Sequence, residues 1–173
     1  MKKLIIILIL FTGSLASFSQ KIKEQKTDPV TGQQIKSTIA EFIYSTFNNE
    51  YVTSECIRKG DNYSLVLRIT TTNTVYTVQQ GKPLIIKLSN DSSLRLTVPI
   101  DFTSKIGSGI AGSFGQIKYG VTIEFKLNAH DKASLINTPI KLVRMYADNF
   151  SNDYEIKSKY KNVISKQLSL LSQ

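Results

Sequence analysis

The chain has 173 residues, 41% of them hydrophobic, and its 22 lysine and arginine residues outnumber its 13 aspartate and glutamate residues, giving a formal net charge of +9. This length and composition suit one domain with a buried core. A single cysteine and a single histidine exclude an internal disulfide and any zinc site built on several Cys and His ligands, so we expect no metal and no cofactor.

Residues 1–19 have the layout of a secretory signal peptide. Lys2 and Lys3 precede an apolar run from Leu4 to Phe11, and small residues follow. The run is too short to cross a bilayer as a helix, which needs about 20 apolar residues. We therefore expect export and no integral membrane span.

Two cleavage positions satisfy the preference for small side chains one and three residues before the cut. One lies after Ala16 and the other after Ser19, which would make Gln20 the new N-terminus. Either cut removes two lysines and lowers the net charge by two. No cysteine lies near the cut, so we expect a periplasmic, surface or secreted protein without a lipid anchor attached there.

Residues 20–36 are polar and rich in lysine, and Asp28, Pro29 and Gly32 interrupt them. We expect a leader or linker that need not pack. We place a single β-rich domain at residues 37–173.

Strand patterns begin at the start of this domain. The runs Thr38–Asn48 and Tyr51–Lys59 mix β-branched and aromatic residues and predict a hairpin. The second run would bury Cys56 as a small, unreactive thiol. Two further strands are predicted where apolar residues alternate in 63–70 and where Val75, Tyr76 and Val78 form a short run.

The clearest hairpin is predicted within Lys82–Phe102. Apolar residues alternate along both halves, and the short polar side chains of Ser89–Ser93 favour the turn between them. A glycine-rich loop at Lys105–Gly115 follows. The next strand, within 116–129, has the most regular alternation in the chain.

The C-terminal quarter mixes helical and strand signals. Asp131 could cap a short helical turn through Leu135. Thr138–Ala147 suits either a helix that begins at Thr138 and Pro139 or a buried strand, and we favour the strand.

From about residue 153 to 172, apolar residues recur at spacings of three and four, which predicts an amphipathic helix. Asn152 and Glu155 resemble a capping box, although Tyr154 and Ile156 could extend a strand before the helix starts. The predicted fold is mainly β (α+β): an antiparallel β-sandwich or open barrel with this C-terminal helix packed on the sheet.

One glycine motif has the spacing GxGxxG, at Gly107, Gly109 and Gly112. A dinucleotide fingerprint needs a helix directly after the glycines, whereas strand pattern follows here, so we reject that interpretation. Glycine loops also let a ligand approach the backbone closely. The residues proposed for such a ligand loop are Lys105, Gly107, Gly109, Gly112 and Gly115.

Catalytic signals are sparse. His130 and its neighbour Asp131 come without a GxSxG motif, so we interpret His130 as a surface residue at a strand end. The segment Asp148–Asp153 lacks the spacing of an EF-hand loop. We therefore propose no catalytic and no metal-binding residue.

The overall layout resembles a broad class of exported Bacteroidota proteins that are rich in β-structure. The resemblance rests on a signal that ends in SFSQ, a polar leader with DPVTG, a β-rich middle and a terminal helix. It implies an envelope or secreted location. The resemblance assigns no functional role to any residue of this chain.

These observations favour an exported, non-enzymatic binding or interaction module of the cell envelope. Its positive charge suits an anionic envelope component or a protein partner, whereas scattered basic residues and the absence of tryptophan argue against nucleic acid. One alternative is a small hydrolase that uses two carboxylates on an envelope polymer. Another is a peripheral membrane protein that uses its basic C-terminal helix, with Lys157, Lys159, Lys161 and Lys166.

Export can be tested by expressing the full chain in an exporting bacterial host and measuring the intact mass of the released protein. We expect an N-terminus at Gln20 or at Ser17, because only these follow cuts that satisfy the small-residue preference. Recovery of the chain in the cytoplasm with its N-terminal apolar run intact would contradict this.

Overall fold

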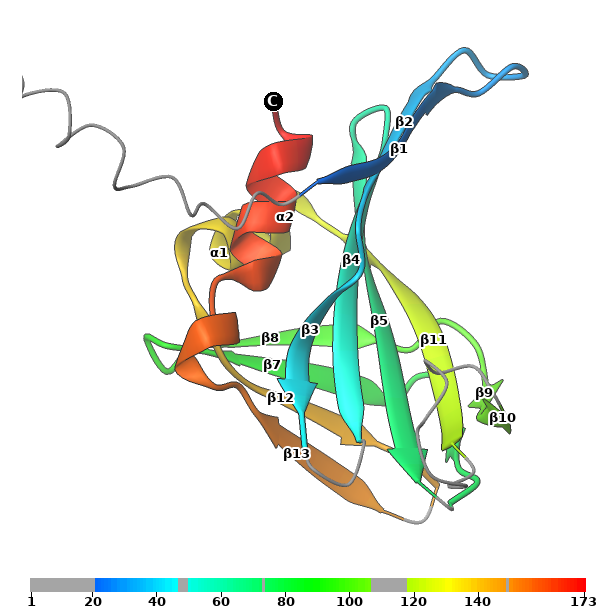
Figure 1. The fold of residues 1–173 in the computed structure, drawn as a ribbon, viewed down its shortest axis with the longest axis vertical. Coiled ribbons are helices and arrows are strands. Elements are labelled where there is room, and N and C mark those ends of the chain that lie inside the picture. The colour runs from blue at the N-terminus through cyan, green and yellow to red at the C-terminus, as the bar shows by residue number, and fades with distance from the viewer. Residues whose placement is uncertain (1–20, 47–49, 73, 107–117, 149) are drawn as a thin grey trace, which may run out of the picture.

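Two antiparallel sheets form the body of the protein. The computed structural model describes residues 21–46, 50–72, 74–106, 118–148 and 150–173. The strands of the smaller sheet run across the strands of the larger one, as Figure 1 shows, and the helices cover one end of the larger sheet. The sheets do not close into a barrel, and the fold is mainly β, as predicted.

The larger sheet has the strand order β1-β2-β4-β5-β11-β10, and β3 pairs with β4 beyond the end of β2. The bounds of its strands are β1 Ile22–Thr27, β2 Gln34–Thr38, β3 Glu41–Ser45, β4 Tyr51–Lys59, β5 Asn62–Thr72, β10 Lys105–Ile106 and β11 Lys118–Leu127.

The smaller sheet has the order β13-β12-β7-β8, and a short pair, β6-β9, stands beside it. These strands are β6 Thr77–Val78, β7 Pro83–Leu88, β8 Ser93–Thr97, β9 Phe102–Thr103, β12 Ile140–Tyr146 and β13 Ser151–Glu155. The helices are α1 Ala129–Asn137, the 3₁₀ turn η1 Ser158–Tyr160 and α2 Val163–Leu171.

The predicted central hairpin is confirmed as β7-β8. Leu84 pairs with Leu96 and Ile86 with Leu94, and all four side chains are buried. Asp91 adopts a φ of 64° in the turn, a left-handed conformation that a short polar residue tolerates. The alternation predicted this pair because only one face of the smaller sheet packs against the core.

The alternation predicted for β5 and β11 is confirmed as well. The buried side chains Leu65, Leu67 and Ile69 of β5 lie opposite those of Phe125, Ile123 and Val121 of β11. The hairpin of β3 and β4 forms where it was predicted. Cys56 is fully buried within β4, as predicted.

The predicted leader is wrong where it covers residues 22–36. Residues 22–27 and 34–38 form the hairpin β1-β2, which extends the larger sheet through β4 (Figure 1). The Asp28 carboxylate organises its turn by accepting hydrogen bonds from the amides of Val30 and Thr31, at 2.8 and 3.1 Å. Because β1 is exposed along almost its whole length, its sequence has no hydrophobic period that could predict a strand.

The predicted start of the C-terminal helix at about residue 153 is also wrong. Residues 151–155 form β13, and the helix begins at Val163. Tyr154 and Ile156 are buried with the smaller sheet, so the alternative that these residues extend a strand is the one that occurs. The segment Thr138–Ala147 contains β12, which confirms the strand that we favoured.

Helix α1 is longer than the predicted turn, and Asp131 does not cap it. The cap is Asn128, whose side-chain oxygen accepts a hydrogen bond from the amide of Asp131 at 2.8 Å. The acidic side chain of Asp131 then lies in the first turn, where the helix dipole favours a negative charge.

Helix α2 packs on the larger sheet through its apolar face and through one buried amide, that of Gln167. The amide nitrogen donates to the backbone carbonyls of Ile39 and Ser54, at 3.0 and 2.9 Å. Its oxygen accepts from the Ser54 hydroxyl at 2.9 Å and from the Cys56 thiol at 3.7 Å. Both the nitrogen and the oxygen of the Gln167 side-chain amide therefore form hydrogen bonds.

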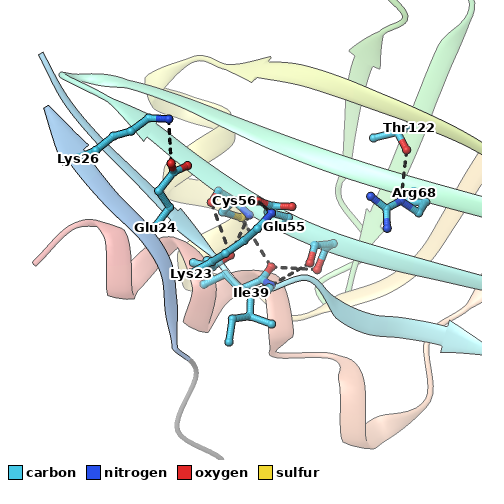
Figure 2. A network of polar contacts seen from close by, with 11 residues as sticks. Lys23, Glu24, Lys26, Ile39, Glu55, Cys56, Arg68 and Thr122 are labelled. Carbon is cyan, nitrogen blue, oxygen red and sulfur yellow. Dashed lines mark hydrogen bonds and ion pairs between the residues drawn. The ribbon is translucent and has the colours of Figure 1, made fainter. Parts of the chain in front are cut away.

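The position of Gln167 follows from a change of partner along β4. The pairing of β2 with β4 ends at Ser37, and the pairing of β3 with β4 begins at Glu41. Between these points the Thr38 hydroxyl accepts a hydrogen bond from the Cys56 amide at 3.0 Å. Cys56 lies close to Ile39, whose carbonyl Gln167 binds (Figure 2). Hydrogen bonds from side chains thus replace the backbone hydrogen bonds of the ladder where the strand partner of β4 changes.

We predict that Gln167→Leu lowers the free energy of unfolding by about 3 kcal/mol, because the Ser54 hydroxyl, the buried Ser54 carbonyl and the partly buried Ile39 carbonyl would lose their partner. Urea denaturation measures this change. The control Gln79→Leu, at an exposed position, should change stability by less than about 0.5 kcal/mol. Equal effects of the two substitutions would contradict this role of Gln167.

Candidate ligand groove

The glycine loop proposed as a ligand loop is mostly beyond what the structure describes. Gly107, Gly109, Gly112 and Gly115 lie outside the described residues. Lys105 belongs to β10 and pairs opposite Gly120 at the edge of β11. The ligand loop therefore stays a prediction.

His130 is a surface residue, as predicted, although it lies in the first turn of α1. Its side chain is 81% exposed, and its Nδ1 lies 3.7 Å from a carboxylate oxygen of Asp131. Within the described ranges, no three His, Cys, Asp or Glu side chains gather as a metal site. We find no catalytic arrangement around His130.

One concave feature of the described residues is a groove of about 990 Å³ along the outer face of the larger sheet, which we name the β11–β8 groove. Outward-facing residues of β4, β5 and β11 form one wall. Strand β8, the segment 99–102 and the first turn of α1 form the other. The groove therefore joins the two sheets at their adjacent edges.

Apolar side chains lie along the middle of the groove. Val66 of β5 is half-buried at its centre, and Ile57 of β4 lies beside it. On the opposite wall stand Phe102 and Ile100, and Ile100 is 57% exposed. An exposed isoleucine opposite a half-buried valine forms a surface that an apolar ligand group would cover.

Charged groups of both signs surround this apolar centre. The acids that line the groove are Glu55, Glu124 and Asp131, and the cations are Lys59, Arg95 and Lys126. Glu55 and Glu124 both pair with Val66 across the sheet, so they flank it in one row on the same face. Because acids and cations are balanced here, the groove does not share the strong positive charge of the whole chain.

The N-terminal hairpin contributes to one end of this row. Lys23 of β1 forms an ion pair with Glu55 at 3.1 Å, as Figure 2 shows. Glu24 pairs with Lys26 at 2.8 Å in the same hairpin, and the hydrogen bond from Lys26 lowers the pKa of Glu24. The hairpin thus holds the carboxylate of Glu55, one of the three acids that line the groove.

In the part of the chain that the structure describes, the backbone edges along the groove carry little strand pairing. Strand β10 pairs with β11 at Tyr119 and Gly120. Among the described residues, no strand pairs with that edge of β11 over residues 122–127, and β8 ends the smaller sheet. Within these residues, each edge has amide and carbonyl groups that an added chain could bind.

The row Glu55–Val66–Glu124 did not emerge from sequence reasoning, because its members belong to three strands and meet only through strand register. The available signal was the polar face of the strand within 116–129, on which Thr122, Glu124 and Lys126 alternate with buried residues. That pattern predicted an exposed face. It did not predict which segments lie opposite it.

Arg144 and Asp153 form a further exposed ion pair, between β12 and β13 on the smaller sheet. The hydrogen bond from Arg144 lowers the pKa of Asp153. This pair lies outside the residues that line the groove. We assign it no role in binding.

No helix in the described part of the chain is long and apolar enough to cross a membrane.

Comparisons with known proteins provide no relative for this chain. No family model matches it, and neither a curated protein nor a solved structure is similar to it. No residue role can therefore be carried over from another protein. The candidate groove rests on the geometry of its own side chains.

Cys56 is expected to be inert in the native protein, because burial raises the pKa of its thiol far above the ordinary range and the thiolate is the reactive form. At about pH 8.5, where an exposed thiol is partly ionised, native protein should be labelled by iodoacetamide at least ~100-fold more slowly than protein in denaturant. Equal rates in native and denatured protein, measured by mass spectrometry, would contradict the burial of this thiol.

Proposed function

We propose that this protein is an exported, non-enzymatic binding module of the cell envelope that holds an extended segment of a protein partner in the β11–β8 groove. The observation that carries the proposal is the combination of an apolar centre, charges of both signs and an open strand edge along one groove. Export itself rests on the N-terminal sequence, as argued above.

An extended polypeptide fits this combination better than other polymers. A peptide can add to the edge of β11 as a further strand, with alternate side chains directed into the groove. Its apolar side chains would cover Val66 and Ile100, and its charged side chains would meet Glu124 or Arg95. An anionic polymer gains less, because the groove presents as many acids as cations.

A selection of random peptides displayed on phage tests this proposal. We expect extended peptides that carry both charge signs to be enriched on the wild-type protein. Val66→Lys should weaken their binding by about tenfold or more, because it places a charge in the apolar centre of the groove.

The matched control is Leu142→Lys. Leu142 is also a half-buried apolar residue within a strand, but it lies on the smaller sheet, and neither it nor its cross-strand partners line the groove. Its substitution should leave peptide binding unchanged. Peptides that bind both variants equally well, or a selection that enriches none, would refute the groove as a peptide site.

The carboxylate row favours one second candidate, the hydrolase. Glu55 and Glu124 lie two strands apart on one face, which places their Cα atoms about 10 Å from each other. Inverting glycosidases hold their two carboxyl groups roughly 6.5–9.5 Å apart. This candidate ranks second because Glu55 already forms an ion pair with Lys23, and because Glu124 is exposed to solvent and so lacks the burial that would raise the pKa of an acid catalyst.

Release of reducing ends from a panel of envelope polysaccharides tests the hydrolase. If this candidate holds, Glu124→Gln abolishes the release, whereas the control Glu24→Gln, in the exposed β1 strand, preserves it. We expect no release by the wild-type protein. Release that Glu124→Gln abolishes would replace the binding module with the enzyme.

A further inference from the structure

A second surface lies at the other side of the larger sheet, where β3 meets η1 and α2. A smaller groove of about 510 Å³ runs between Glu41 and Phe42 of β3 and residues 159–166. Strands β4 and β5 separate it from β11 in the order of the sheet. This surface is therefore independent of the β11–β8 groove and of the function proposed for it.

Apolar side chains project from this edge into solvent. Ile39, which joins β2 to β3, is 41% exposed, and Phe42 is 38% exposed. Figure 2 shows the Ile39 side chain directed away from the polar cluster that holds its carbonyl. The exposure of Ile39 has a structural cause. Gln167 binds the backbone carbonyl of Ile39 at the point where β4 changes its strand partner, and this contact holds the Ile39 backbone in place.

Two lysines and one acid lie beside these apolar groups. Lys159 and Lys166 line the groove together with Glu41, and Lys159 Nζ lies 4.5 Å from the centre of the Tyr160 ring. The two cations outnumber the one acid, so the groove is basic. We name the surface formed by Ile39, Phe42, Lys159 and Lys166 the basic edge.

The C-terminal helix cannot act as a free amphipathic membrane helix. Its apolar residues Val163, Ile164, Leu168 and Leu171 are buried against the sheet and α1. The alternative mechanism, in which this helix alone lies on a membrane, is therefore not available to the folded protein, whose helix packs on the sheet as expected. The exposed apolar groups come from the β2–β3 junction instead, and the η1–α2 segment supplies the charge.

We infer that the basic edge docks on an anionic lipid surface. Exposed apolar side chains beside Lys159 and Lys166 match the interface of a bilayer, where apolar groups enter the acyl boundary and lysines reach the headgroups. Each lysine near an anionic surface strengthens such binding by about fivefold. The complementarity of charge is what selects this occupant over a neutral surface.

Sedimentation with lipid vesicles tests the inference on the mature chain recovered from an exporting host. We compare vesicles of phosphatidylcholine with vesicles in which about one third of the lipid is phosphatidylglycerol. The protein should partition into the anionic vesicles far more strongly than into the neutral ones, and high salt should remove the difference. Equal partitioning into both would overturn the inference.

Paired variants locate the binding surface. Lys159→Gln with Lys166→Gln should reduce partitioning into anionic vesicles by about 25-fold, whereas Lys82→Gln with Lys126→Gln, two exposed lysines elsewhere, should reduce it by less than about threefold. Ile39→Ser should weaken partitioning, and Val30→Ser, at a residue that is 90% exposed in the β1–β2 turn, should not.

Two results would contradict docking at this edge. If both lysine pairs weaken binding equally, the attraction comes from net charge and not from the basic edge. If soluble glycerol phosphate displaces the protein from the vesicles, the edge binds a single headgroup and not a lipid surface. Failure of vesicle binding leaves the peptide groove intact, because the two surfaces share no residue.

Discussion

The fold depends on how β4 keeps its hydrogen bonds while its neighbour changes from β2 to β3. A buried carbonyl without a partner costs free energy, and the change leaves the carbonyls of Ser54 and Ile39 outside the ladder. The amide of Gln167 binds both of them. Since Gln167 is on α2, the same contacts fix the terminal helix on a sheet whose strands lie far from it in sequence.

Both candidate surfaces follow from this arrangement. Strand β4 continues through the junction, so its outward-facing Glu55 stays in register with Val66 and Glu124 and forms one wall of the groove. Helix α2, which Gln167 holds on the sheet, carries Lys166, and the preceding turn η1 carries Lys159; both lysines line the groove beside the start of β3. In the two proposals, one face of the sheet holds a partner chain and the β3 edge rests on a lipid surface.

Strands that bury one face could be predicted from the sequence, whereas strands that are exposed on both faces could not. Alternation identified β7, β8 and β11 because each has one face in the core. The hairpin β1-β2 lacked this signal because β1 is exposed along almost its whole length. In 153–160, Tyr154 and Ile156 fit both a strand and a helix, and only pairing with β12 decides between them. The groove could not be predicted in this way, because its residues meet through the register of three strands, and a local sequence pattern does not determine that register.

The central claim is that β11 accepts an added strand along its open edge. Hydrogen exchange of backbone amides, measured with and without a selected peptide, tests this most directly. We predict that the peptide slows exchange at alternate amides within residues 122–127, because in an antiparallel pair alternate amides point to the added strand. Protection that appears only elsewhere, or no change within these residues on saturation with peptide, would contradict the claim.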